Sequence, residues 1–134
     1  KKVRVTVDER GLVISLAADS FFREASADVD IEAARQLLQR IVGLLITLPG
    51  SSFAIEGHTD ATPTAPGGDY PTNWELSSAR ANNVLHYLVD LGADESKFQT
   101  RGYADTMPLA SNDTRDGRAY NRRIDIVILS EGHL

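Results

Sequence analysis

Two oppositely charged side chains could together bind a ligand that carries both charges. Asp60 ends the segment Gly57-His58-Thr59-Asp60, and Arg80 lies in Leu76-Ser77-Ser78-Ala79-Arg80-Ala81. A carboxylate accepts hydrogen bonds from an ammonium group, and the planar guanidinium of arginine makes two parallel charge-assisted bonds to a carboxylate. If the fold brings Asp60 and Arg80 together, the pair can hold a zwitterion. Without a ligand, the two side chains can partly neutralise each other.

The segments around this pair predict that the two residues meet. The short apolar run 53–55 follows a Pro-Gly-Ser-Ser turn and is typical of a buried strand, which places Asp60 at the strand's C-terminal end. Segment 61–71 contains three prolines and two glycines, so we expect an exposed loop of functional length. Thr72 and Glu75 match a capping box, which predicts a helix that begins at Asn73.

On that helix, the polar and apolar positions fall on distinct faces. Asn73, Leu76 and Arg80 share one face by the i, i+3, i+7 spacing. Gly92 is placed to end the helix in a left-handed conformation. The inner face is predicted to contain Trp74, Ala81, Val84, Leu85, Leu88 and Leu91.

The rest of the chain predicts one α+β domain over residues 1–134. Alternating apolar residues in 3–16 indicate a β-hairpin, and Asp28 and Asp30 are candidate N-caps of a long amphipathic helix that ends at Pro49-Gly50. Segments 98–103 and 123–129 read as two further strands. This order predicts a β-α-β-α-β sandwich, in which two long helices cover a mixed sheet.

Composition narrows the function classes. The 134 residues are 42% hydrophobic and 25% charged, which is typical of one globular domain, and no apolar run approaches the roughly 20 residues that cross a bilayer. We therefore expect the chain as given to be soluble. The net charge of −5 argues against a nucleic-acid partner, because such a partner requires a basic surface. The absence of cysteine leaves the redox compartment open.

Taken together, these motifs resemble the peptidoglycan-binding domain of the OmpA family. The resemblance also includes Gly117-Arg118-Ala119-Tyr120-Asn121-Arg122-Arg123 and runs from about Phe21 to Leu129. Two features are most similar to the flagellar stator branch of the family, MotB: the sequence motif Asn73-Trp74-Glu75-Leu76-Ser77 and the long loop 61–71. The same loop departs from the shorter one of the outer-membrane branches.

The resemblance implies a ligand and a set of contacts. Asp60 and Arg80 would hold the zwitterionic end of meso-diaminopimelate in the peptidoglycan stem peptide. The resemblance implies further ligand contacts by Thr59, Asn73 and Leu76, and a second basic contact or support from Arg122 or Arg123. It implies neither a cofactor nor a metal.

The implied function is a non-catalytic anchor that holds a flagellar stator to the cell wall. The chain would then be the periplasmic part of a longer inner-membrane protein, with peptidoglycan, a second copy of itself and a MotA-like stator subunit as partners. The alternatives are a peptidoglycan anchor of an outer-membrane lipoprotein or porin, and an anchor of a secretion system. Upstream sequence would discriminate between them.

Other residues support competing hypotheses. Glu56, His58 and Asp60 would share one face of a strand, which suggests a metal site or a cell-wall hydrolase as alternatives. No His-x-x-x-His or cysteine pair completes a ligand set for a metal. Trp74 is expected to anchor its helix in the core rather than to stack on sugars. The run 44–46 exceeds one helical stripe, which makes a dimer interface a hypothesis.

Overall fold

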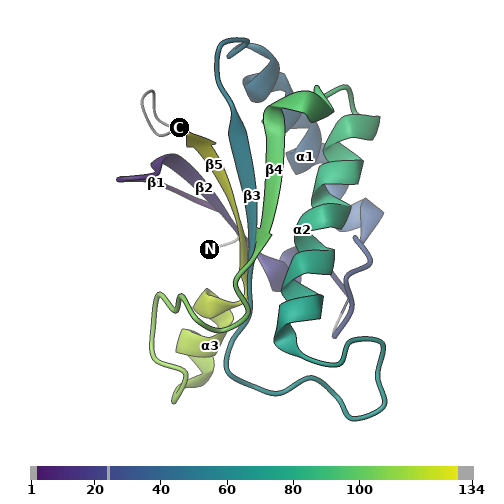
Figure 1. The fold of residues 1–134 in the computed structure, drawn as a ribbon, viewed down its shortest axis with the longest axis vertical. Helices are drawn as coiled ribbons and strands as arrows, with labels where there is room; N and C mark the ends of the chain where they lie inside the picture. The colour runs from purple at the N-terminus through teal and green to yellow at the C-terminus, as the bar shows by residue number, and fades with distance from the viewer. Residues whose placement is uncertain (1–2, 24, 130–134) are drawn as a thin grey trace.

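The computed structural model describes residues 3–23 and 25–129, and these form one mixed five-stranded sheet with helices packed on it (Figure 1). The strands are β1 (Val3–Asp8), β2 (Gly11–Ala17), β3 (Phe53–His58), β4 (Phe98–Gly102) and β5 (Arg123–Leu129). The helices are α1 (Ile31–Ile46), α2 (Asn73–Asp90), α3 (Arg115–Asn121) and the 3-10 turns η1 (Ala18–Ser20) and η2 (Glu95–Lys97).

The sheet has the order β1-β2-β5-β3-β4. Only β3 and β4 run parallel, because α2 connects them, and the other neighbours are antiparallel. The predicted hairpin is therefore an integral part of the sheet, since β2 pairs with both β1 and β5.

The long helices α1 and α2 lie side by side on one face of the sheet (Figure 1). The main core forms between this face and the two helices, and it includes Leu38 and Ile41 of α1, Val84 and Leu88 of α2, and Ile126 of β5. The predicted α+β sandwich with two covering helices is confirmed. No helix within residues 3–23 and 25–129 combines the length and apolar character that a bilayer span requires.

Local capping signals place the ends of both long helices. Asp30 caps α1 by accepting a hydrogen bond from the amide of Ala33 at 3.4 Å, so the second of the two candidate caps is the one used. The capping box of Thr72 and Glu75 is present, and α2 begins at Asn73 as predicted. Gly92 follows α2 with φ of +113°, where a side chain would be strained.

Trp74 contradicts the prediction that it anchors α2 in the core, because the residue is 50% exposed. By helical spacing it lies on the same stripe as the buried Ser77 and Ala81. Side chains on a helix point back toward its N-terminus, so a residue in the first turn projects beyond the helix end. Trp74 therefore lies at the surface.

A third helix, α3, was not predicted. Arg115 and Arg118 both belong to this helix. The hydroxyl of Thr114 caps it by accepting from the amide of Gly117 at 2.9 Å. Figure 1 shows α3 apart from α1 and α2, near the end of the sheet where β5 begins.

Candidate functional site

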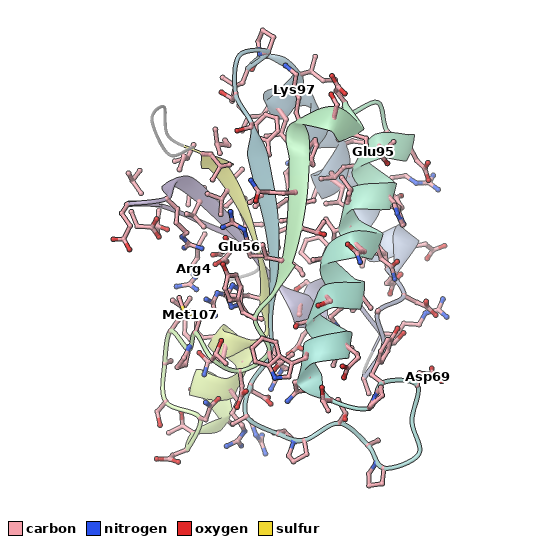
Figure 2. All side chains as sticks on the ribbon, in the orientation of Figure 1. Arg4, Glu56, Asp69, Glu95, Lys97 and Met107 are labelled. Atoms are coloured by element: carbon pink, nitrogen blue, oxygen red, sulfur yellow. The ribbon has the colours of Figure 1, made fainter. Side chains whose placement is uncertain are left out.

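A cavity of about 440 Å³ lies where β3 ends and α2 begins. The loop 61–71, which contains neither helix nor strand, forms one side of it and includes the lining residue Asp69, which is labelled in Figure 2. The cavity is lined by six of the predicted site residues: Thr59, Asp60, Asn73, Leu76, Arg80 and Arg122. Asp19 of η1 and Ala25 also line it, and sequence reasoning singled out neither.

Asp60 is 6% exposed and is held by two hydrogen bonds. Its Oδ2 accepts from Nη1 of Arg122 at 2.6 Å, and its Oδ1 accepts from the amide of Thr62 at 2.8 Å. Burial opposes ionisation, but the bonds from Arg122 and Thr62 outweigh it and keep the pKa of Asp60 below its ordinary value. The carboxylate is therefore ionised at neutral pH and oriented in the cavity.

Arg122 bridges Asp60 to Asp19. Its Nε and Nη2 donate to the two carboxylate oxygens of Asp19 at 3.0 and 2.9 Å, which is a bidentate pair. The hydrogen bonds that Arg122 donates to Asp19 raise the pKa of Arg122, so this cation is fixed in place. Asp19 belongs to none of the motifs in the sequence. It lies just before Phe21, where the resemblance to the OmpA family begins, and this position was the only signal for it.

The structure does not contain the expected ion pair between Asp60 and Arg80, in which the two charges would neutralise each other. Among the described residues, the ion pair of Asp60 is with Arg122, and Arg80 has no carboxylate oxygen within 4.0 Å. The C-terminal motif places Arg122 close to the strand end, so this arginine pairs with Asp60 instead. Arg80 faces the same cavity from α2.

Arg80 is 7% exposed and is supported by the segment 21–30. Its Nε donates to the carbonyl of Ser26 at 2.8 Å, and its guanidinium carbon lies 4.9 Å from the centre of the Phe22 ring. Removal from water lowers the pKa of Arg80, although a guanidinium stays charged at neutral pH. A carboxylate that entered the cavity would offset this desolvation.

Asn73 and Thr59 organise the backbone around Asp60. The Nδ2 of Asn73 donates to the carbonyl of Thr62 at 3.0 Å, which closes the turn after Asp60. The amide of Thr59 donates to the carbonyl of Ala104 at 2.8 Å, and the amide of Ala104 donates to the hydroxyl of Ser77 at 3.0 Å. The turn is thereby attached to α2.

Two glycines allow α2 to approach the sheet closely. A Cβ added to Gly57 would lie 2.1 Å from the carbonyl oxygen of Ser77, and one added to Gly102 would lie 2.7 Å from the amide nitrogen of Ser78. Gly57 and Gly102 are paired neighbours on β3 and β4. Their missing side chains set the short separation between the element that carries Asp60 and the one that carries Arg80.

Arg123 lies outside this cavity. It is buried, its Nε donates to Asp125 at 3.2 Å, and its Nη2 donates to the carbonyl of Met107 at 3.0 Å. Desolvation lowers its pKa despite the pair with Asp125. Of the two adjacent arginines, Arg122 is therefore the candidate for ligand contact and Arg123 has the contacts of a support residue.

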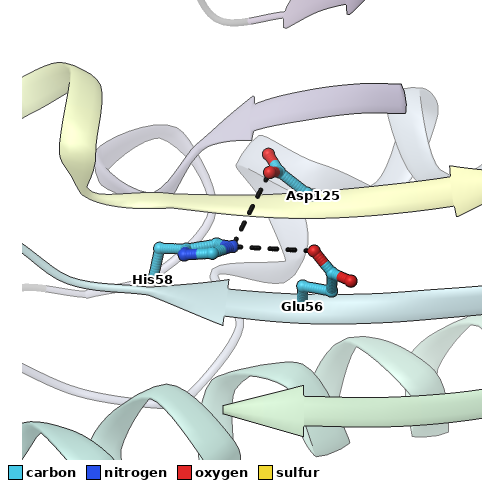
Figure 3. A group of neighbouring side chains, drawn as sticks. All are labelled: Glu56, His58 and Asp125. Atoms are coloured by element: carbon cyan, nitrogen blue, oxygen red, sulfur yellow. Dashed lines mark ion pairs between the residues drawn. The ribbon is translucent and has the colours of Figure 1, made fainter. Parts of the chain in front are cut away.

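The predicted grouping of Glu56, His58 and Asp60 is wrong. Because β3 ends at His58 and the chain then turns, Asp60 leaves the face that the other two share. Asp125 of β5 takes its place, and Nε2 of His58 lies 3.8 Å from Oε1 of Glu56 and 3.6 Å from Oδ2 of Asp125 (Figure 3). Figure 2 shows Glu56 on the face of the sheet away from α1 and α2.

This buried cluster has the donor types of a metal site but already contains a cation. Nη1 of Arg10 lies 2.5 Å from Oε1 of Glu56 and 3.5 Å from Oδ2 of Asp125, between the two carboxylates. Arg101 and Arg123 pair with the same two carboxylates. A metal ion would have to displace Arg10 and face two further guanidinium groups, so the residues present fit a charge network better than a metal.

The fold and the cavity define a class of domain: a mixed sheet covered by two helices, with a buried carboxylate and a buried guanidinium facing one cavity at the end of β3. The model of the OmpA family matches residues 21–122, and the chain belongs to the OmpA family.

Individual relatives give a more particular placement. The chain is 42% identical over 122 residues to the uncharacterized protein YtxE of Bacillus subtilis, covering 90% of this chain and 49% of that protein. It is 33% identical over 132 residues to Motility protein B of the same organism, covering 98% and 50%. The cell wall anchor of the T6SS from Pseudomonas aeruginosa has the same fold, with a TM-score of 0.86, 36% identity and coverage of 97% and 89%. The chain spans about half the length of these two curated relatives, and it is an OmpA-like domain similar to that of MotB.

Proposed function

We propose that this domain binds peptidoglycan without cleaving it, by holding the zwitterionic end of meso-diaminopimelate in the stem peptide. The ammonium group contacts Asp60 and the carboxylate contacts Arg80, with Thr59, Leu76 and Arg122 forming the rest of the site. The single observation that carries this proposal is that buried, oppositely charged Asp60 and Arg80 line one cavity of suitable size.

The charges of the cavity support a zwitterion over a simple anion or cation. Asp60 already receives a charge-assisted bond from Arg122, so an incoming ammonium would share an ionised and oriented carboxylate. The guanidinium of Arg80 is anchored through Nε, which leaves its terminal nitrogens as the donors for a carboxylate. A ligand with both groups compensates both sites at once and adds no net charge.

We further propose that the domain anchors a flagellar motor stator to the cell wall. The likeness to Motility protein B over nearly the whole chain supports this assignment. In this assignment, the chain is the periplasmic part of an inner-membrane protein that acts as a homodimer with a MotA-like subunit. The exposed Leu44 and Ile46 at the end of α1 support a dimer surface.

A second candidate is the anchor of a secretion system. The solved structure of the T6SS cell wall anchor is 36% identical to this chain, and the same cavity would serve both functions. A strain lacking the full-length gene discriminates between them, because a stator anchor is needed for swimming and a secretion anchor is not.

The test is co-sedimentation of the purified domain with peptidoglycan sacculi. We expect the wild type to pellet, and Asp60→Ala and Arg80→Ala to lose at least about 30-fold in affinity, because removing one buried charge partner costs roughly 2–5 kcal/mol. Asp113→Ala and Arg40→Ala remove exposed residues of the same types and serve as controls. Equal binding by all five proteins would refute the proposed site.

Two further measurements define the ligand. A soluble muropeptide with meso-diaminopimelate should bind, and its lysine counterpart, which lacks the second carboxylate, should bind at least about 10-fold more weakly. Sacculi incubated with the domain should release no soluble muropeptides. Such release would instead indicate a hydrolase.

A further inference from the structure

Ala25 of the segment 21–30 lines the cavity, and side chains of α2 bind the neighbouring carbonyls of Ser26 and Ala27. Nε of Arg80 donates to the carbonyl of Ser26, and Nδ2 of Asn83 donates to the carbonyl of Ala27, both at 2.8 Å. Arg80 and Asn83 are three positions apart on α2, so they lie on the same side of the helix. Asn83 does not line the cavity, whereas Ala25 and Arg80 do.

The segment combines its own hydrogen bonds with those from α2. The amide of Ser26 donates to the carbonyl of Arg23 at 3.1 Å, and the amide of Asp28 donates to the hydroxyl of Ser26 at 2.9 Å. The base of the segment is closed by the bridge between Phe22 and Val29 and by the bond from the amide of Asp30 to the carbonyl of Phe21. At the tip, Ala25 has φ of +54°, a left-handed conformation that a residue with a Cβ disfavours. A strained conformation persists when surrounding contacts fix it, and the bonds from α2 are such contacts.

We propose that Asn83 is a positioning residue for the ligand's carboxylate. By holding the carbonyl of Ala27, Asn83 fixes the neighbouring carbonyl of Ser26, which orients Nε of Arg80. The ring of Phe22 supports the same guanidinium from the base of the segment. This inference rests on the proposed function, because it assigns Asn83 a part in the binding that Arg80 performs.

Orientation matters because the bidentate contact is planar. A guanidinium matches a carboxylate through two parallel bonds only when its plane is aligned with the ligand. Without Asn83, Arg80 keeps its charge but must be ordered when the ligand binds, and that ordering weakens the affinity. Asn83 therefore affects ligand binding without touching the ligand.

Asn82 provides a matched control. It is the neighbouring residue on α2, it is exposed, and its Oδ1 accepts from the hydroxyl of Thr100 at 2.7 Å, away from the cavity. Asn82→Ala and Asn83→Ala each remove one side-chain hydrogen bond and gain the same helix propensity. A difference between them in ligand binding reports the contact with the segment 21–30.

The experiment measures the affinity of each variant for the meso-diaminopimelate muropeptide by calorimetry. We expect Asn83→Ala to bind about 3- to 10-fold more weakly than the wild type, and Asn82→Ala to stay within about 2-fold. In an Arg80→Lys background, which lacks the Nε donor that bonds Ser26 and the planar guanidinium that it orients, Asn83→Ala should cause no further loss, because coupled residues are not additive. An equal loss in both backgrounds would overturn the positioning role.

A second readout follows Arg80 directly. The Nε proton of Arg80 should exchange with water at least about 10-fold faster in Asn83→Ala than in Asn82→Ala, as measured by nitrogen-15 NMR. Equal exchange rates in the two variants would overturn the inference. A wild type that binds neither sacculi nor muropeptide would refute the proposed function, whereas a binding wild type with an unaffected Asn83→Ala variant would refute only the inference about Asn83.

Discussion

Gly57→Ala tests the contact that sets the separation between Asp60 and Arg80. The added Cβ would lie 2.1 Å from the carbonyl oxygen, 2.9 Å from the carbonyl carbon and 3.2 Å from the Cα of Ser77. Ordinary van der Waals contact begins at 3.4 Å, so β3 and α2 must separate by 3.4 − 2.1 = 1.3 Å along that line. All three clashing atoms are backbone, so a rotamer change cannot relieve them.

The separation has two measurable effects. Overpacking of this kind costs roughly 1–3 kcal/mol of the free energy of unfolding, and a clash with backbone belongs at the upper end of that range. Because β3 leads to Asp60 and α2 carries Arg80, the same displacement moves the two charges apart. A shift of that size exceeds the tolerance of hydrogen bonds, which lie at about 2.7–3.2 Å, so muropeptide affinity should fall by at least about 10-fold.

Gly43→Ala is the matched control for this substitution. Gly43 lies inside α1, and a Cβ added there meets nothing within 4 Å. Alanine should raise the free energy of unfolding by roughly 0.5–1 kcal/mol through helix propensity and leave binding unchanged. Urea unfolding followed by circular dichroism and muropeptide calorimetry measure both variants. A Gly57→Ala protein as stable as the wild type and with full affinity would refute the close-contact reasoning.

Three further predictions concern single side chains. Asn121→Ala removes four hydrogen bonds, leaves the amides of Leu109 and Ala110 without their acceptor, and should lower the free energy of unfolding by about 3 kcal/mol in urea titrations. Thr72→Ala should cost about 1 kcal/mol in the same assay through the lost cap of α2, with no loss of the cavity's charges. Asp60 has a lowered pKa, so it stabilises the fold above the ordinary aspartate value near 3.9, and this contribution disappears as the pH falls through the lowered pKa. Asp60→Asn should therefore be less stable than the wild type at pH 7, and the difference should shrink as the pH falls through the lowered pKa of Asp60. A stability difference that does not change with pH would contradict the assignment.

Local signals in the sequence were sufficient for most of the elements. The capping box at Thr72 and the Pro/Gly composition of 61–71 each act over a few residues and predicted the right boundary, and Asp30 was one of two candidate caps for α1. The cap at Thr114 is equally local, but α3 has only 7 residues and buries few side chains, so periodicity gave no sign of it. Short helices lack the repeated apolar positions on which such a prediction depends.

The partners of charged residues could not be predicted in the same way. Asp60 and Arg122 are 62 positions apart in the chain, and their bond depends on where the connection after α3 enters β5. The replacement of Asp60 by Asp125 beside His58 likewise depends on the register between β3 and β5. Strand periodicity alone assigns a face to each side chain but does not say where the strand stops, and here β3 stops two residues before Asp60.

The same dependence on the whole fold links stability to the proposed binding. The charged residues that line the cavity come from different elements: Asp19 from η1, Asp60 from just beyond β3, Arg80 from α2, and Arg122 from between α3 and β5. No short segment contains both an acidic and a basic member, so an unfolded chain has no binding site to offer. A ligand that binds only the folded state raises the free energy of unfolding by RT ln(1 + [L]/Kd). This is about 2.7 kcal/mol when the ligand concentration is a hundredfold above Kd. The wall polymer presents many copies of one stem peptide, so a domain that binds it should be stabilised wherever it is anchored.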